Sequence, residues 1–318
     1  MPAILTHYTF ALSAIPKEDE RFSAVVNLGS QGPDTFMAYG TLPWKKREEV
    51  TKIRQWGHTM HYLPVGSVYL KMMEYARTSP DKEMLFAYID GLLMHYSVDR
   101  ICHRYIFYRS GFDEHGQLKG YYSWSHGFFE AILDKTLAKK RGTYQKMSKC
   151  IESPLDQVEK ISKMWAYASP AKLDDGAFLR SYEDFVGAEN MLYTPTGAKR
   201  LLFRLIGKYS TPYAQAHPHS IKKFEVLDVI NESHTVWYDP VTKEEHKESV
   251  EEQLQMAHAR YLEVHELLLK AKRGEDIKEA FNEWTENIDH NGCPIGTTKK
   301  HYSLCWEVLG EAKYLPPR

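Results

Sequence analysis

The stretch His95-Tyr-Ser-Val-Asp99-Arg-Ile-Cys-His103 decides both the fold and the chemistry that the sequence predicts. It lies within residues 80–108, where apolar residues recur at helical spacing. On such a helix, side chains four and eight positions apart point the same way, and the two imidazoles lie about 12 Å apart along the axis. That distance is too long for both to bind one ion through bonds of about 2 Å. The spacing therefore predicts at least two metal ions along one helix, with Asp99 as the candidate bridge.

Helical signals dominate the remainder of the chain. Further helices are predicted over 3–15, 46–77 with a break near 64–66, 122–140, 153–168, 176–187, 195–209 and 247–273. A tight loop is expected over 29–34, and one short extended pair around 235–240 and 245. The sequence thus predicts an all-α protein with a single helical domain over 1–318. Residues 1–140 form its metal-site core, and 141–318 add packing helices and the short hairpin.

The composition argues against several classes of protein. The 42 acidic and 41 basic residues nearly cancel, so the chain lacks the basic field of a duplex-binding protein, and no nucleic-acid partner is expected. No apolar run approaches the ~18 residues of a membrane span. The apolar segment at the N-terminus could suggest a signal peptide, but no basic residues precede the apolar run and His7 interrupts it. We therefore expect a retained helix and a cytoplasmic protein. The four scattered cysteines, Cys102, Cys150, Cys293 and Cys305, are consistent with a reducing compartment or simply with ordinary buried thiols.

A second candidate ligand pair follows in the next predicted helix. His126-Gly-Phe-Phe-Glu130 places an imidazole and a carboxylate four positions apart, on one helical face. Such a pair alone is common on protein surfaces. Here it follows the first motif in consecutive helices, and both motifs are flanked by apolar sequence, where an unpaired charge is costly. The two motifs together therefore predict a shared metal site.

These motifs, with three others in order, resemble the zinc-dependent phospholipase C family. That family includes bacterial phospholipases C and the catalytic domain of alpha-toxin, with nuclease P1 as a distant relative. The resemblance covers roughly residues 5 to 135. The three further islands are Thr6-His7-Tyr-Thr, Gly32-Pro33-Asp34 and Gly57-His-Thr-Met-His61.

The resemblance implies an all-α zinc-dependent hydrolase of phosphate esters and assigns a role to each matching residue. Asp34, His61, His95 and Asp99 would surround one ion, His103, His126 and Glu130 would hold a second, and His7 would join Asp99 at a third. Asp34, expected on a loop, is also the candidate general base. The implied cofactor is Zn²⁺, as two or three ions, although a set of nitrogen and oxygen ligands also suits Fe or Mn.

Two departures from the family bear on the third ion and on the helix. The secreted enzymes use an amino-terminal Trp as a ligand, whereas this chain begins Met-Pro and has no Trp before His7, so the third site would need water or another group. The secreted enzymes also place more residues between the Asp and the following His than separate Asp99 from His103. The shorter spacing keeps both on one regular helix. The β-sandwich membrane domain of alpha-toxin has no counterpart, because nothing after residue 250 alternates like strands.

Several alternatives stay open. Spacing alone does not separate His58 from His61, but the resemblance favours His61, which follows Gly-x-x-Met. Tyr121, Tyr122 and Trp124 either line a pocket for a choline head group or pack in the core, and core packing is favoured. His115 lies in the loop between the two motifs and is not assigned to the site. The remaining histidines are expected to be surface or structural residues: His217, His219, His234, His246, His258, His265, His290 and His301.

The expected substrate is a phosphate ester, either a lipid head group or a small molecule. Two ions about 3.5–4 Å apart can activate water and neutralise phosphoryl oxygens, which phosphodiester hydrolysis requires. The alternative is a metal-binding protein of the same fold without turnover. A phosphohydrolase of the HD superfamily is disfavoured because the chain contains no His-Asp dipeptide. The sequence gives no indication of the oligomeric state.

Overall fold

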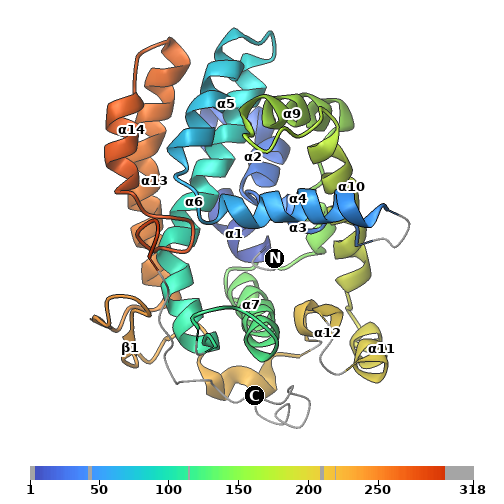
Figure 1. Ribbon diagram of the computed structural model, residues 1–318. Coiled ribbons are helices and arrows are strands. Elements are labelled where there is room, and N and C mark those ends of the chain that lie inside the picture. Colours follow the sequence, from blue (N-terminus) through green and yellow to red (C-terminus); the bar gives the residue numbers. More distant parts are fainter. Residues whose placement is uncertain (1–3, 42–44, 114, 208–210, 219, 298–318) are drawn as a thin grey trace.

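One long central helix organises the computed structural model, which describes residues 4–41, 45–113, 115–207, 211–218 and 220–297 (Figure 1). This helix, α6 (Lys82–Ser110), is buried along nearly its whole length. α2 (Ser23–Gly29) and α13 (Val250–Arg273) pack against it. A Cβ added to Gly91 would lie 2.3 Å from the Val26 carbonyl oxygen, so the α2–α6 approach requires glycine there. The chain therefore wraps around the helix that carries the His95–His103 motif.

Helices from the first 140 residues surround this centre. They are α1 (Ile4–Ala14), the 3₁₀ helix η1 (Lys17–Phe22), α2, α3 (Asp34–Met37), α4 (Arg47–Met60), α5 (Gly66–Thr78) and α7 (Tyr121–Lys140). The predicted break near residues 64–66 is confirmed, since α4 ends before it and α5 begins at Gly66. α1 ends before Pro16, which has no backbone N–H to continue the helix.

The second half adds further helices and one short hairpin. Its elements are α8 (Met147–Cys150), α9 (Leu155–Ala168), α10 (Ala177–Leu192), α11 (Ala198–Ile206), α12 (Thr211–Gln215), η2 (Lys222–Leu227), β1 (Trp237–Tyr238), β2 (Glu245–His246), α13 and α14 (Lys278–Thr285). α10 extends to Leu192, beyond the predicted end at 187, and α11 is shorter than the predicted 195–209. The helices over 17–29 and 278–285 were not predicted. The all-α prediction is confirmed.

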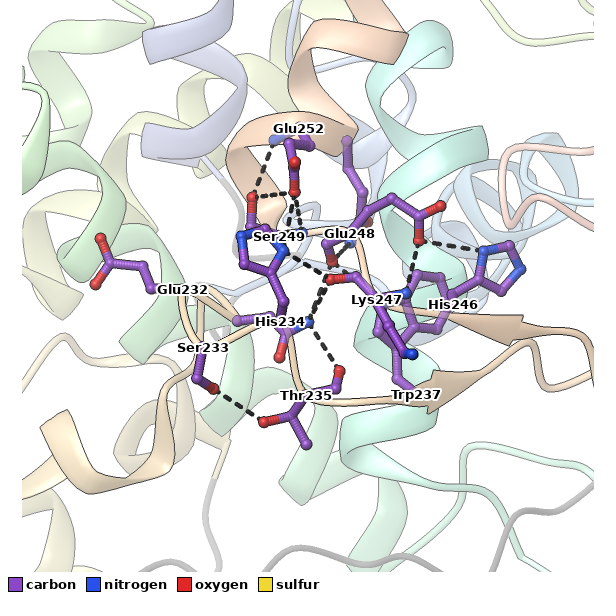
Figure 2. A network of polar contacts seen from close by, with 12 residues as sticks. Glu232, Ser233, His234, Thr235, Trp237, His246, Lys247, Glu248, Ser249 and Glu252 are labelled. Atoms are coloured by element: carbon purple, nitrogen blue, oxygen red, sulfur yellow. Dashed lines mark hydrogen bonds and ion pairs between the residues drawn. The ribbon is translucent and has the colours of Figure 1, made fainter.

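The expected extended pair is present and leads into α13 (Figure 2). Trp237 pairs with His246 across the antiparallel hairpin, and its indole N–H donates to the Glu248 carbonyl at 3.2 Å. α13 then begins with a capping box. The Ser249 hydroxyl accepts from the Glu252 N–H, and the Glu252 carboxylate accepts from the Ser249 N–H. Among the described residues β1 and β2 form the sole two-stranded sheet, and no β-sandwich is present.

The structure also tests the expectation about membrane spans. Within the described ranges, no helix combines the length and the apolar character needed to cross a bilayer.

Candidate metal centre

The central helix places three of the predicted residues on one face. His95 Nε2 lies 3.0 Å from Asp99 Oδ2, and His103 Nδ1 lies 3.5 Å from Asp99 Oδ1. The four-residue spacing on α6 produces this arrangement, because each step returns the side chain to nearly the same side. Asp99 thus contacts imidazoles on both sides, in agreement with the geometry expected of a bridge.

α3 and α4 bring a second set of atoms to His95. Asp34 Oδ1 lies 3.1 Å from His61 Nε2, and ligand-type atoms of Asp34, His61 and His95 all lie within 4.8 Å of one another. Asp34 was expected on a loop, but it is the first residue of α3, because the turn that ends at Pro33 leads directly into this short helix. His61 follows the last residue of α4. His58 lines the same cleft without joining any such group of the described residues.

α1 contributes His7 on the other side of Asp99. His7 Nε2 lies 3.2 Å from Asp99 Oδ1, and its ring centroid is 4.3 Å from that of His95. Atoms of His7, His95 and Asp99 also lie within 4.8 Å of one another. Residues 1–3, which would carry any amino-terminal ligand, lie outside the described residues.

A third group forms between α6 and α7. Glu130 Oε1 lies 3.1 Å from His126 Nε2 and 3.7 Å from His103 Nε2. The rings of His103 and His126 are nearly parallel, with centroids 6.0 Å apart. Ligand-type atoms of the three residues lie within 4.8 Å of one another. All eight predicted residues therefore lie in three adjoining groups.

Hydrogen bonds orient four of these imidazoles. In each, Nδ1 lies within hydrogen-bond distance of an oxygen acceptor, which fixes the proton there and leaves the Nε2 lone pair for a metal. The pairs are His61 with Gly57 O at 2.8 Å, His95 with Ser30 O at 3.1 Å, His103 with His290 O at 3.2 Å and His126 with Ser110 Oγ at 3.3 Å. The Ser110 hydroxyl proton is used elsewhere, because it donates to the Ile106 carbonyl. This arrangement is typical of metal-binding histidines.

The buried acids of the centre require a cation. Within the described part of the chain, the carboxylates of Asp34, Asp99 and Glu130 make ion-pair contacts with imidazoles and with no Lys or Arg. One oxygen of each carboxylate is buried without a hydrogen-bond partner, as is His95 Nε2. Such groups are costly to bury unless a charge compensates them. A donor set of imidazole nitrogens and carboxylate oxygens fits Zn²⁺.

The carboxylates of Asp99 and Glu130 are ionised, as carboxylate ligands of a metal must be. Burial alone would raise the pKa of Asp99, but His103 and His95 hold it well below its usual range. The pKa of Glu130 is lowered in the same way by His126 and His103, against the effect of burial. Burial would lower the pKa of His95, yet the neighbouring Asp99 raises it. The carboxylates are therefore ionised and available as ligands.

The three groups lie on the wall of one cleft of about 950 Å³. Its lining includes His7, Asp34, Asp99 and Glu130, and also the cationic side chains of Arg54 and Lys119. The Arg54 Nε–H donates to the Tyr39 carbonyl at 2.5 Å, which anchors this side chain. An anionic substrate in the cleft would thus meet both the centre and two positive side chains.

Two residues that the sequence analysis missed support the centre from behind. His290 was expected to be a surface or a structural histidine, and it is structural: it is fully buried, with its ring 5.3 Å from that of His61 and 5.6 Å from that of His95. The Tyr69 hydroxyl lies 3.1 Å from His290 Nε2. The Asn291 side-chain amide donates to the His61 carbonyl at 2.8 Å. His219 and His301 lie outside the described residues.

The aromatic residues before His126 mainly pack in the core. Trp124 is buried, and its ring stacks on that of Phe128 with centroids 4.7 Å apart, although the residue also contributes to the lining of the cleft. The rings of Tyr121 and Tyr122 contact each other, with centroids 5.2 Å apart, and neither residue lines the cleft. The packing interpretation therefore describes these residues better than a choline pocket does.

A comparison with protein families agrees with this geometry. A family described as zinc dependent phospholipase C matches residues 2–170, a range that contains all eight residues of the three groups. No curated protein and no solved structure matches the chain significantly.

Proposed function

The chain belongs to the zinc-dependent phospholipase C family, and we propose that it hydrolyses phosphate esters in the cleft that holds the three ligand groups. The observation that carries this proposal is the position of Asp99, whose two oxygens face imidazoles of α1 and α6 in a buried site. A metal-dependent phospholipase C-like function follows from the family and from these groups. The number of ions and the turnover are our proposal.

We assign the ligands as follows. Asp34, His61, His95 and Asp99 hold one zinc ion, His103, His126 and Glu130 hold a second, and His7 joins Asp99 at a third. The short distances within each group support this allocation. The third ion has the fewest ligands among the described residues, so we expect it to bind most weakly.

The chain's own residues would hold the substrate and move its protons. Zinc, when bound, lowers the pKa of coordinated water and polarises phosphoryl oxygens. Asp34 lies at the cleft with its carboxylate ionised, since His61 and His95 lower its pKa against the effect of burial. It is therefore suited to accept a proton from the attacking water as well as to bind metal. Arg54 and Lys119 would hold the phosphate against the centre.

The substrate class is a phosphate ester, as a lipid head group or a small molecule. We also propose a reducing, cytoplasmic location, which is supported by the buried thiols of Cys102 and Cys150, neither of which forms a disulfide. Cys305 lies outside the described residues.

Metal analysis together with hydrolysis assays tests the proposal. Protein purified without a histidine tag should contain about two or three equivalents of zinc and should hydrolyse p-nitrophenyl phosphorylcholine or bis-p-nitrophenyl phosphate. Absence of tightly held metal would contradict the proposal. Zinc without hydrolysis of any phosphate ester would indicate instead a metal-binding protein without turnover.

The variant Asp99→Asn tests the central residue. It should lose zinc and hydrolysis while its helical circular dichroism is retained, because an amide is a weaker ligand and cannot bridge two cations as a carboxylate does. Asp90→Asn is the matched control. Asp90 is equally buried on α6, but it binds Tyr261 and His265 away from the centre, so its loss should leave the zinc content unchanged. Full activity of Asp99→Asn would remove the proposed mechanism.

A further inference from the structure

α11 presents its apolar side chains to solvent. Leu201, Leu202 and Leu205 are 58%, 52% and 77% exposed, and their spacing places them on one face of this nine-residue helix. A helix on the surface of a globular protein normally turns its apolar face toward the core. Here the apolar face is outward, and among the described residues no core element covers it.

The inward face is held by a cation and an aromatic ring. The Arg200 side chain is buried, with its guanidinium 4.8 Å from the Phe128 ring centroid and 4.4 Å from that of Tyr213. It also donates to the Ala216 carbonyl. Phe203, on the same side, packs against the core. These contacts fix the rotation of the helix, so the outward leucines are a consequence of specific packing.

The segment of the chain that contains α11 carries only positive charges. Residues 191–224 contain no Asp or Glu and include six cationic residues, Lys199, Arg200, Arg204, Lys208, Lys222 and Lys223, in a chain of net charge −1. Lys199 and Lys222 are exposed. Exposed leucines beside cations are complementary to a partner whose outer layer is anionic and whose interior is apolar.

The helix also connects two segments that line the cleft. Met191 and Leu192, at the end of α10, and Pro212, in α12, line the cleft, and α11 connects these two segments in the chain. Figure 1 shows α11 at the periphery of the molecule, next to α12 and at the same end as α7. A surface that engaged α11 would therefore lie close to two segments of the cleft wall.

We propose that α11 docks the protein on a membrane that contains anionic lipids, with its leucines inserted among the acyl chains and exposed cations of residues 191–224, such as Lys199, at the head groups. This inference rests on the proposed function and narrows its substrate class to phosphate esters that reside in a membrane. Docking of this kind is reversible, because three leucines and a few cations supply a modest partition energy.

Vesicle binding by the full chain tests the proposal. The wild type should co-sediment with vesicles of equimolar phosphatidylcholine and phosphatidylserine, bind vesicles of phosphatidylcholine alone more weakly, and lose affinity as salt is added. The double variant Leu201→Gln with Leu205→Gln should bind the mixed vesicles at least about tenfold more weakly, because it removes most of the inserted apolar surface. Leu205→Gln alone should show a smaller loss in the same direction.

A matched double variant controls for the loss of exposed leucine in general. Leu155 and Leu262 are 58% and 49% exposed on α9 and α13, and their change to Gln should leave vesicle binding unchanged. Equal losses from both double variants, or no binding by the wild type, would overturn the inference. So would light scattering that shows a dimer which the α11 variant dissociates, since a second copy would then cover the leucines. The binding assay needs no turnover, so vesicle binding without hydrolysis would refute the proposed function and leave the docking surface standing.

Discussion

At the scale of single residues, the centre depends on groups that lie far apart in the chain. The four-residue spacing on α6 and α7 identifies five candidate ligands, and the resemblance adds His7, Asp34 and His61. His290 and Asn291 could not be found in this way. They lie in a loop 187 residues or more after His103, and a single His-Asn pair in a turn has no periodicity that would link it to His61 or His103.

Asn291 gives the first prediction. Asn291→Ala removes the donor to the His61 carbonyl, so His61 is less firmly held beside Asp34. Loss of an outer partner of a metal ligand typically weakens metal binding by about 10–100-fold. We expect that reduction at the ion held by Asp34 and His61, with a smaller effect at the ion of His126. Competition titration with a zinc chelator measures both.

Asn231→Ala is the control for this experiment. The Asn231 amide likewise donates to backbone carbonyls, those of Thr235, Lys247 and Glu248, but it lies at the hairpin. The change should lower the thermal stability and leave the zinc affinity intact. Equal zinc affinity of wild type and Asn291→Ala would show that the amide does not position His61.

At the scale of elements, the periodic helices were predicted and the short ones were not. α6 and α7 have enough turns for their apolar spacing to be recognised, whereas α3 has four residues and η1 has six. Short helices of this kind are stabilised by their tertiary neighbours more than by their own sequence. The prediction that Asp34 lies on a loop was wrong for this reason.

The α2–α6 contact gives the second prediction. Gly91→Ala would place a Cβ 2.3 Å from the Val26 carbonyl oxygen and 2.9 Å from Gly29 Cα, so the helices must separate. We expect a net loss of about 2 kcal/mol in the free energy of unfolding, measured with urea. Gly127→Ala in α7 is the matched control, because the nearest atom would be 3.6 Å away. It should be neutral or stabilising by up to about 1 kcal/mol. Equal effects would mean that close approach is not the reason for glycine at 91.

The junction of α1 and α7 gives the third prediction. The buried Asp134 carboxylate accepts from the N–H groups of Leu5 and Thr6 and from the Thr6 hydroxyl, at the positive end of α1. Asp134→Ala should lower the free energy of unfolding by about 3 kcal/mol, because it leaves buried donors without an acceptor. Thr6→Val removes only the hydroxyl bond and should cost about 1 kcal/mol. An unchanged urea midpoint for Asp134→Ala would contradict the assigned role in holding the helix that carries His7.

At the scale of the whole molecule, the sequence predicts which side chains share a helix face. It does not predict whether that face turns toward the core or toward solvent. The pattern over 195–209 predicts a helix, and the apolar face of a surface helix normally turns toward the core. The structure reverses this, because Arg200 finds two aromatic rings and a carbonyl inside, contacts that depend on Phe128 and Tyr213 from other helices. Likewise, the centre assembles only when α1, α3, α4, α6 and α7 meet, which no single stretch of sequence encodes.

The pH dependence of global stability gives the last prediction. Glu189, on α10, is buried, and burial together with the nearby Asp134 raises its pKa to about 8. Between its unfolded value of 4.5 and about 8, the native state keeps a proton that the unfolded state has released. The native state therefore binds more protons, and this group makes stability fall as pH rises, by at most about 1.4 kcal/mol per pH unit.

Glu189→Gln should remove that slope, because the amide does not titrate. Urea unfolding of zinc-free protein at pH values from 5 to about 9 should show the variant gaining stability over the wild type up to about pH 8 and keeping a constant advantage above it. Glu183→Gln, an exposed position on the same helix, should follow the wild type. Parallel curves for Glu189→Gln and the wild type would mean that Glu189 is already ionised in the native state. In that case the interior between α7 and α10 would have to contain a compensating cation.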